Sequence, residues 1–211
     1  MTGSRYLVEA LGRRILVDCG LFQGFKQLRA RNRKPFPVRV NTIDTVLLTH
    51  AHLDHSGYLP TLIRAGFRGR ILCTEAADLC GLILPDSGHI QEEEARFAAR
   101  RGYSKHKKPK PLYTLKDAKA ALDRFDLQPF DRRIDLGDGI AARFIPAGHL
   151  LGAAQIRLEV GGRVVHFSGD LGHDPDPLMR PPQPFGGADV LVCESTYGNR
   201  SHPDVDPEAD L

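Results

Sequence analysis

The segment "THAHLDHSGYLP", residues 49–60, places three histidines and an aspartate within six residues, directly after the apolar run "TVLL". The polar residues are His50, His52, Asp54 and His55. If all four side chains face the protein interior, they lose their hydration, and this loss must be offset by binding partners. Imidazole nitrogens and carboxylate oxygens are the ligands that zinc and similar divalent cations prefer. This segment therefore predicts a metal site, and no other segment of the chain predicts one as strongly.

Three further candidate ligands follow predicted strands elsewhere in the chain. His149 follows "ARFIPAG", Asp170 follows "VVHFSG" and Glu194 follows "DVLVC". Loops at one edge of a sheet carry the chemistry in many α/β scaffolds, so we expect these side chains to meet the histidine cluster. Taken alone, a histidine such as His149 is more often a hydrogen-bonded polar residue than a metal ligand. A ligand set of histidine and aspartate without cysteine favours an open catalytic site over a closed structural one.

The apolar patterning predicts strands interspersed with helices, and therefore a mixed fold of the α+β or α/β class. We expect a hairpin over 5–20 that turns at Gly12, and helices over 57–66, 75–102 and 114–125. The second helix should be interrupted near Pro85, and the third should begin at Thr114 as N-cap with Asp117 three residues later. Further strands are expected over 42–50, 70–74, 138–147, 153–160, 163–170 and 188–195, the last of them buried.

Composition excludes several classes of protein. No apolar stretch approaches the roughly 18 residues that a membrane span needs, and the N-terminus lacks the pattern of a signal peptide. The four cysteines are scattered, which is typical of small buried residues in a reducing compartment, so we expect a cytoplasmic protein that does not bind a membrane. A net charge of +3 does not by itself indicate nucleic acid. The acid-free stretch 100–110 favours a solvated loop, with a phosphate-contacting edge as the alternative.

Several motifs together resemble a known family. "THAHLDHSGYLP" resembles the H-x-H-x-D-H signature of the metallo-β-lactamase superfamily, whose fold is an αββα sandwich. "VDCGLFQG", "DSGHIQEEEA", "PLYT", "AGHLLGAA", "FSGDLG" and "CESTYGNR" resemble its β-CASP branch of RNA-processing nucleases. The resemblance runs in order from about residue 2 to residue 200. It implies that residues 1–211 form the N-terminal part of the metallo-β-lactamase domain, and that the β-CASP cap and the C-terminal part of the fold are absent from this chain.

The resemblance also implies roles for individual residues. His50, His52 and His149 would hold one zinc ion, Asp54 and His55 the second, and Asp170 would bridge the two. Asp54 would also help to hold the attacking water. Asp18 would support the ligands from behind, although an aspartate after a strand can equally cap a turn. Glu194 would orient a later histidine that acts as general acid, and that histidine, like the one completing the second zinc site, would lie beyond Leu211.

The predicted function is a zinc-dependent ribonuclease that cleaves single-stranded RNA by water activated between two ions, with a homodimer expected for the full-length protein. One alternative is a metallo-hydrolase of small thioesters or lactones, which leaves "ESTYGNR" unexplained. Another is a catalytically incomplete protein that binds RNA or a partner subunit. The remaining histidines receive no catalytic role. We expect His89 near the cleft or on a helix surface, His166 to be structural, His106 and His202 to be solvated, and we assign nothing to His173.

Overall fold

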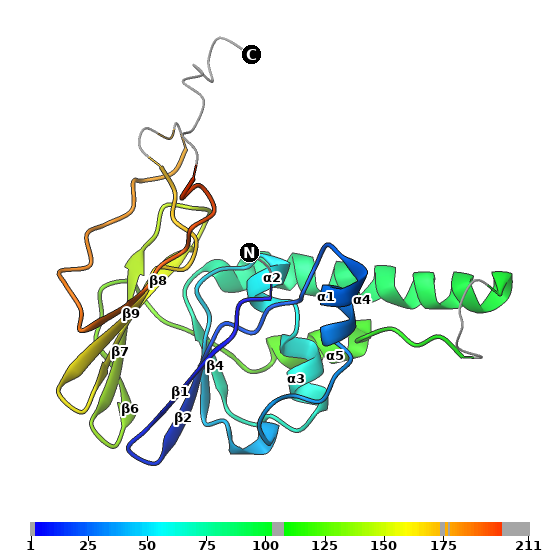
Figure 1. Cartoon of the computed structure of the whole chain (residues 1–211), viewed down its shortest axis with the longest axis horizontal. Coiled ribbons are helices and arrows are strands. Elements are labelled where there is room, and N and C mark those ends of the chain that lie inside the picture. Colours follow the sequence, from blue (N-terminus) through cyan, green and yellow to red (C-terminus); the bar gives the residue numbers. More distant parts are fainter. Residues whose placement is uncertain (1–2, 103–107, 174–175, 177, 200–211) are drawn as a thin grey trace, which may run out of the picture.

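Two five-stranded sheets lie face to face, and helices cover the outer side of the first sheet (Figure 1). The computed structural model describes residues 3–102, 108–173, 176 and 178–199. The described part thus has three layers, in the order helices, sheet, sheet.

The first sheet has its strands in chain order. They are β1 (Tyr6–Ala10), β2 (Arg13–Val17), β3 (Thr45–Leu47), β4 (Arg70–Cys73) and β5 (Phe125–Leu127). The first two strands form the predicted antiparallel hairpin, and the other neighbours pair in parallel. At its turn Leu11 and Gly12 both have positive φ, 51° and 78°, which suits the right-handed twist of a tight hairpin. Strand β5 was not predicted from the sequence.

The second sheet is mostly antiparallel. Its order is β10 (Val190–Val192), β9 (Arg163–Phe167), β8 (Ala154–Val160), β7 (Ile140–Pro146) and β6 (Ile134–Gly137). Strands β7, β8 and β9 follow the predicted ranges, whereas β6 was not predicted. Strand β10 pairs in parallel with β9 at the sheet edge. The prediction that it is buried was wrong, because Val190 and Leu191 are about half exposed (51% and 49%) on an edge strand.

Alternation along the strands builds two cores. Leu16 and Leu48 pack with the helices, whereas Ile15, Val17 and Leu47 pack against the second sheet. The central strands are therefore buried on both faces, which explains why they read as continuous apolar runs. This sandwich is the scaffold on which the strand ends bring polar residues together.

The helices are α1 (Lys26–Arg31), α2 (Leu53–Ser56), α3 (Leu59–Arg64), α4 (Ala76–Arg101) and α5 (Leu115–Leu122), with a short 3₁₀ turn at Val40–Thr42. The predicted capping box of α5 is confirmed, since Thr114 and Asp117 hydrogen-bond each other's backbone N–H. The chain already turns helical at Leu53, four residues before the start predicted at Gly57.

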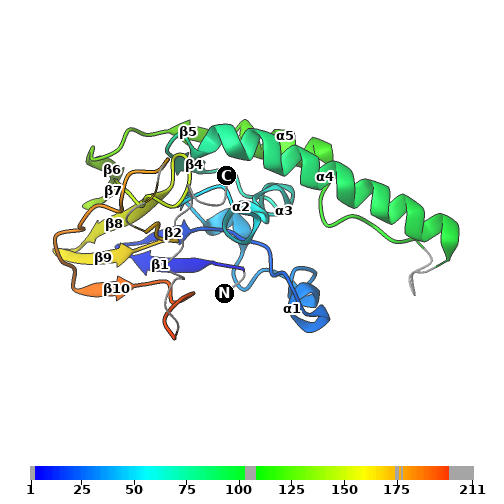
Figure 2. The ribbon, with the colours of Figure 1, turned by 90° about the horizontal axis from the view of Figure 1, so that it is seen from above.

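Helix α4 runs unbroken through Pro85, so the predicted interruption was wrong. A proline inside a helix costs about 3 kcal/mol because its N–H is missing and its ring crowds the preceding turn. Ala76, Cys80, Leu84 and Gly88 form a buried i, i+4 stripe along this half of the helix, and that burial outweighs the cost. The distal half of α4 extends away from the sheets (Figures 1 and 2).

The outer face of the second sheet is covered differently from the first. The extended segment 181–187 lies along it, and Gln155 and Arg157 donate hydrogen bonds to carbonyls of Gln183, Phe185 and Gly187. Of the four layers of the expected αββα sandwich, the described residues supply three. Every helix in the described part of the chain is too short or too polar to span a bilayer.

Candidate metal centre

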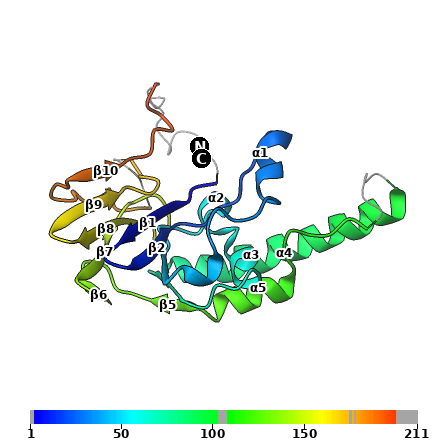
Figure 3. The same cartoon turned by 60° about the horizontal axis from the view of Figure 1, so that its bottom comes forward.

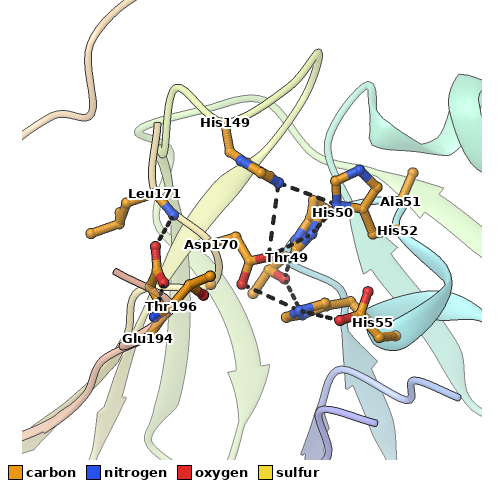
Figure 4. A network of polar contacts seen from close by, with 12 residues as sticks. Thr49, His50, Ala51, His52, His55, His149, Asp170, Leu171, Glu194 and Thr196 are labelled. Carbon is orange, nitrogen blue, oxygen red and sulfur yellow. Dashed lines mark hydrogen bonds and ion pairs between the residues drawn. The ribbon is translucent and has the colours of Figure 1, made fainter. Parts of the chain in front are cut away.

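Four segments meet at one end of the sheets (Figure 4). The end of β2 carries Asp18, and the chain after β3 carries His50 and then His52, the residue preceding α2. The loop between β7 and β8 carries His149, and the chain after β9 carries Asp170. The carboxyl ends of the parallel strands β2 and β3 lie at one edge of the first sheet, and the second sheet packs against it with His149 and Asp170 at the same end, so residues more than a hundred positions apart come together.

The ligand atoms of His50, His52, His149 and Asp170 all lie within 4.8 Å of one another. His52 Nδ1 is 3.1 Å from His50 Nε2 and 3.2 Å from His149 Nε2. Three imidazole nitrogens at such spacing converge on one point, as they do when they share a cation. We name this group of four the ligand cluster.

The Asp170 carboxylate has one oxygen on each side of the site. Its Oδ2 lies 3.7 Å from His50 Nε2 and 3.8 Å from His149 Nε2, whereas Oδ1 lies 3.3 Å from His55 Nε2. Asp54 Oδ2 is 4.0 Å from the same His55 nitrogen. Asp54, His55 and Asp170 therefore form a second group of donors beside the first, with Asp170 belonging to both.

Asp18 is buried behind these donors. Its Oδ2 lies 2.7 Å from His55 Nδ1, and its Oδ1 accepts a hydrogen bond of 2.8 Å from the backbone N–H of Thr49. The Thr49 hydroxyl also contacts both carboxylate oxygens of Asp18 and Nδ1 of His50. These contacts fix the orientation of both imidazoles. Thr49 is a site residue that sequence reasoning missed, although its position between the strand and the first histidine offered a signal.

Burial and charge shift the pKa values of the site in opposite directions. Burial, reinforced by His55, lowers the pKa of His50 to about 2, and burial also lowers the pKa of His149. Burial acts downward on His55 too, but the Asp18 carboxylate and Asp170 raise its pKa to about 10. Burial would raise the pKa of Asp170, yet the hydrogen bond and charge of His55 hold it well below its usual value. His50 and His149 are thus kept neutral, which is the form in which imidazole binds a metal.

Glu194 lies next to the ligand cluster but outside it. Its Oε1 accepts a hydrogen bond from the backbone N–H of Leu171, and its Oε2 accepts one from that of Thr196. These backbone hydrogen bonds oppose the effect of burial and lower the pKa of Glu194. The Glu194 carboxylate thereby links the chain after β10 to the loop that carries Asp170, and this link is the role that the structure shows for it.

The expectation that all four polar residues of the signature face the interior was wrong. His50 and His55 are buried (1% and 6% exposed), but His52 is exposed and Asp54 is half-buried. The cluster is therefore open to solvent on the side of His52, which leaves this face accessible to a ligand.

The other described histidines are not part of the ligand cluster, although His173 lines a pocket together with His149 and Asp170. His89 is exposed on α4, 3.8 Å from Glu93, and His173 is exposed after β9. His166 is fully buried, stacks on Phe185 and contacts Gln155. His106 and His202 fall outside the described residues. Cys19, Cys73 and Cys80 are buried free thiols as expected, whereas Cys193 is exposed.

The donors present fit a divalent cation. Three imidazole nitrogens and a carboxylate, with one open face and histidine rings held from behind, match the ligand chemistry of a catalytic rather than a structural site. The chain therefore carries a histidine and aspartate metal-binding cluster.

Comparison with known proteins identifies the family. The family model described as "Metallo-beta-lactamase superfamily" matches residues 2–198, and the chain belongs to this superfamily. Among solved structures, a subclass B3 metallo-β-lactamase of Bradyrhizobium japonicum has a TM-score of 0.51 at 20% identity, and the match covers 93% of this chain and 74% of that one. This likeness agrees with the predicted metallo-β-lactamase fold.

Curated relatives of the chain include RNA-processing proteins of the β-CASP branch. A ribonuclease of Thermus thermophilus is 36% identical over 96% of this chain and 42% of its own length. The transcription termination factor FttA of Methanococcus maripaludis is 32% identical over 93% of this chain and 29% of its own length. An endoribonuclease of Schizosaccharomyces pombe is 30% identical over 99% and 26%. The chain thus spans less than half the length of these relatives, and the predicted resemblance to the branch is confirmed.

Proposed function

We propose that the chain is the metal-binding part of a zinc-dependent ribonuclease that hydrolyses phosphodiester bonds of single-stranded RNA in the cytoplasm. The observation that carries the proposal is the ligand cluster, in a chain whose relatives include proteins named ribonuclease and endoribonuclease. By the same proposal, residues 1–211 form the N-terminal part of a metallo-β-lactamase domain. Histidine and carboxylate donors suit zinc better than magnesium, which prefers oxygen ligands alone.

The chain's own residues divide the work. His50, His52 and His149 would hold one ion, Asp54 and His55 would hold the other, and Asp170 would serve both. When bound, such ions supply Lewis-acid activation of water and neutralise charge on phosphoryl oxygens. Asp54 is half-buried beside the open face of the site. Its carboxylate can therefore orient the water that attacks phosphorus and accept a proton from it.

Residues behind the ligands would keep this arrangement rigid. Asp18 holds the His55 ring through Nδ1, and Glu194 holds the backbone at Leu171, next to Asp170. Preorganised donors add to catalysis because they need no rearrangement as charge develops. Glu194 would also be available to orient a general-acid histidine, as the family resemblance implies.

The proposal is tested by incubating the zinc-loaded chain with a 5′-labelled single-stranded RNA. We expect RNA shortening that a chelator stops and that His52→Ala abolishes, whereas His89→Ala, which changes an exposed histidine outside the cluster, leaves it intact. A parallel assay with a thioester and a lactone covers small-molecule hydrolysis. Hydrolysis of either compound by a chain that leaves RNA intact would overturn the proposal.

A further inference from the structure

A basic surface lies next to the metal centre. Residues 19–43 contain six lysines and arginines and no aspartate or glutamate. The cations are Lys26, Arg29, Arg31, Arg33, Lys34 and Arg39, and all six are exposed. Lys26, Arg29 and Arg31 lie on α1, and Phe25, which is 82% exposed, precedes this helix as its N-cap residue. We refer to Phe25, Lys26, Arg29, Arg33 and Lys34 as the α1 surface.

Among the described residues, the cations of the α1 surface have no ion-paired carboxylate, unlike several cations elsewhere in the chain. Arg14, Arg70 and Arg133 each form an ion pair with a nearby carboxylate. Within the part of the chain that the structure describes, none of the six cations of residues 19–43 does so. Arg33 and Lys34 follow α1, and Arg33 also donates a hydrogen bond to the carbonyl oxygen of Lys110. Neighbouring like charges without an ion pair repel one another, and an anionic ligand relieves that repulsion.

The α1 surface is fixed to the turn that carries the metal donors. The backbone N–H of Cys19 donates to His55 O (2.7 Å), and that of Leu21 donates to Leu53 O (2.8 Å). Between them, a side chain on Gly20 would lie only 1.5 Å from the carbonyl oxygen of Asp54. The two backbones therefore touch, and the segment leading into α1 cannot move independently of Asp54 and His55.

Aromatic and polar contacts hold α1 in place from below. The Arg5 guanidinium donates to Gly20 O and lies 3.9 Å from the ring centre of Tyr58 and 4.9 Å from that of Phe22. The Asn32 side chain accepts from the backbone N–H of Phe22 and donates to its carbonyl. The cations of α1 thus project from a well-anchored element, and little ordering entropy is lost when they bind a ligand.

A groove of about 600 Å³ lies between the α1 surface and α4 and extends to Leu53, which lies between His52 and Asp54 in the chain. Arg29 and Arg33 line it on the α1 side, and Gln91 and Glu94 line it on the α4 side. In Figure 3, α1 stands on the same side of the molecule as α2. A chain of nucleotides whose scissile bond lies at the ligand cluster can therefore continue along this groove.

We propose that the α1 surface binds a single-stranded RNA segment adjoining the bond that is cleaved. Arg29, Arg33 and Lys34 contact phosphates, and Phe25 stacks on a base. Exposed aromatic rings among cations are characteristic of surfaces that bind single strands, whereas an acidic protein partner would need only the cations. This inference rests on the proposed function, because it identifies how that site holds its substrate.

The test measures binding of a fluorescein-labelled 15-nucleotide RNA by anisotropy, in the His52→Ala background so that the RNA stays intact. The triple variant Arg29→Ala/Arg33→Ala/Lys34→Ala is compared with Lys116→Ala/Lys119→Ala/Arg132→Ala, which removes three exposed cations located elsewhere. Each phosphate contact to a single strand contributes about 0.7 to the slope of log K against log salt, so the first variant lowers the slope by about 2. The second variant leaves the slope unchanged.

Phe25→Ala gives an independent measurement. Loss of one base stack weakens binding by roughly 5- to 150-fold without changing the salt slope. Unchanged RNA binding and slope in the α1 triple variant would overturn the inference, as would stronger competition by polyglutamate than by unlabelled RNA. Absence of RNA cleavage by the wild-type chain bears on the proposed function instead, because the anisotropy measurement requires RNA binding but no cleavage.

Discussion

The Oδ2 atom of Asp18 lies 2.7 Å from Nδ1 of His55, while Nε2 of the same ring lies 3.3 Å from Asp170. Because the Asp18 carboxylate can only accept, Nδ1 carries a proton in this contact. The His55 ring is therefore oriented with Nε2 toward the donors of the site. Asp18 itself has a φ of 58°, an uncommon value for a residue other than glycine, so the backbone is held in a particular conformation to make this contact.

Replacing Asp18 by asparagine should weaken metal binding. The amide nitrogen of Asp18→Asn can donate to Nδ1, which favours a proton on Nε2, the nitrogen that faces Asp170. We expect metal affinity to fall by about 10- to 100-fold, the usual effect of losing a group that orients a ligand. Calorimetric titration with zinc measures this. Asp135→Asn, which changes an exposed carboxylate on β6, is the matched control, and equal zinc affinities for both variants would contradict the role given to Asp18.

His52→Ala should separate metal binding from folding. His52 is exposed, so its removal leaves no cavity, and the free energy of unfolding in the presence of a chelator should change by less than about 0.5 kcal/mol. An ion present at 100 times its dissociation constant stabilises the wild-type chain by about 2.7 kcal/mol, and His52→Ala should lose most of that gain. Urea unfolding with and without zinc measures both quantities. A variant that is stabilised by zinc as strongly as the wild type would show that His52 is not a ligand.

Much of the site could be predicted because its ligands follow strands. Alternating and continuous apolar runs in the sequence predicted β3, β7, β8 and β9. The ligand cluster is built from polar residues that follow β3 and β9 or lie in the β7–β8 loop, and the fold gathers them at one end of the sheets. The motif spacing and the order of motifs then indicated the family. Strands β5 and β6 escaped prediction because they are short, and tertiary pairing rather than local sequence makes them strands.

Other features depend on contacts that no local pattern records. The continuity of α4 through Pro85 reflects packing of its buried stripe, which the helix-breaking rule ignores. The exposure of His52 beside buried His50 depends on how α2 begins. The close approach of Gly20 to Asp54 joins residues 34 positions apart, and sequence alone shows only a glycine after a strand.

Gly20→Ala should therefore damage the site although it adds only one methyl group. The new Cβ would lie 1.5 Å from Asp54 O and 2.6 Å from His55 N, so one backbone has to move. Overpacking of this kind costs about 1–3 kcal/mol, and here it also displaces two metal donors. We expect a lower midpoint of unfolding and weaker zinc binding. Gly81→Ala, in the open surroundings of helix α4, should raise the midpoint slightly because alanine favours a helix, and should leave zinc binding unchanged. A Gly20→Ala chain that matched it in both quantities would refute the contact.

His166 should make stability depend on pH. Gln155 donates through Nε2 to the carbonyls of Pro146 and Gln183, so its Oε1 accepts from His166 Nε2. His166 Nδ1 is then the unprotonated nitrogen, and it is buried without a hydrogen-bond partner. Burial, together with the nearby positive charge of Arg157, lowers the pKa of His166 to about 4.

The sign of the effect follows from the lowered pKa. Between pH 6.5 and pH 4 the unfolded chain binds a proton at His166 that the folded chain does not, so the free energy of unfolding falls as the pH falls through this range. One proton gives a slope of at most about 1.4 kcal/mol per pH unit. Urea unfolding at several pH values should show a shallower dependence for His166→Gln, which keeps a donor but does not titrate. Above pH 7 the free energies of unfolding of the two proteins should differ by a constant amount. Parallel curves from pH 4 to pH 7 would show that His166 is protonated equally in the folded and unfolded states.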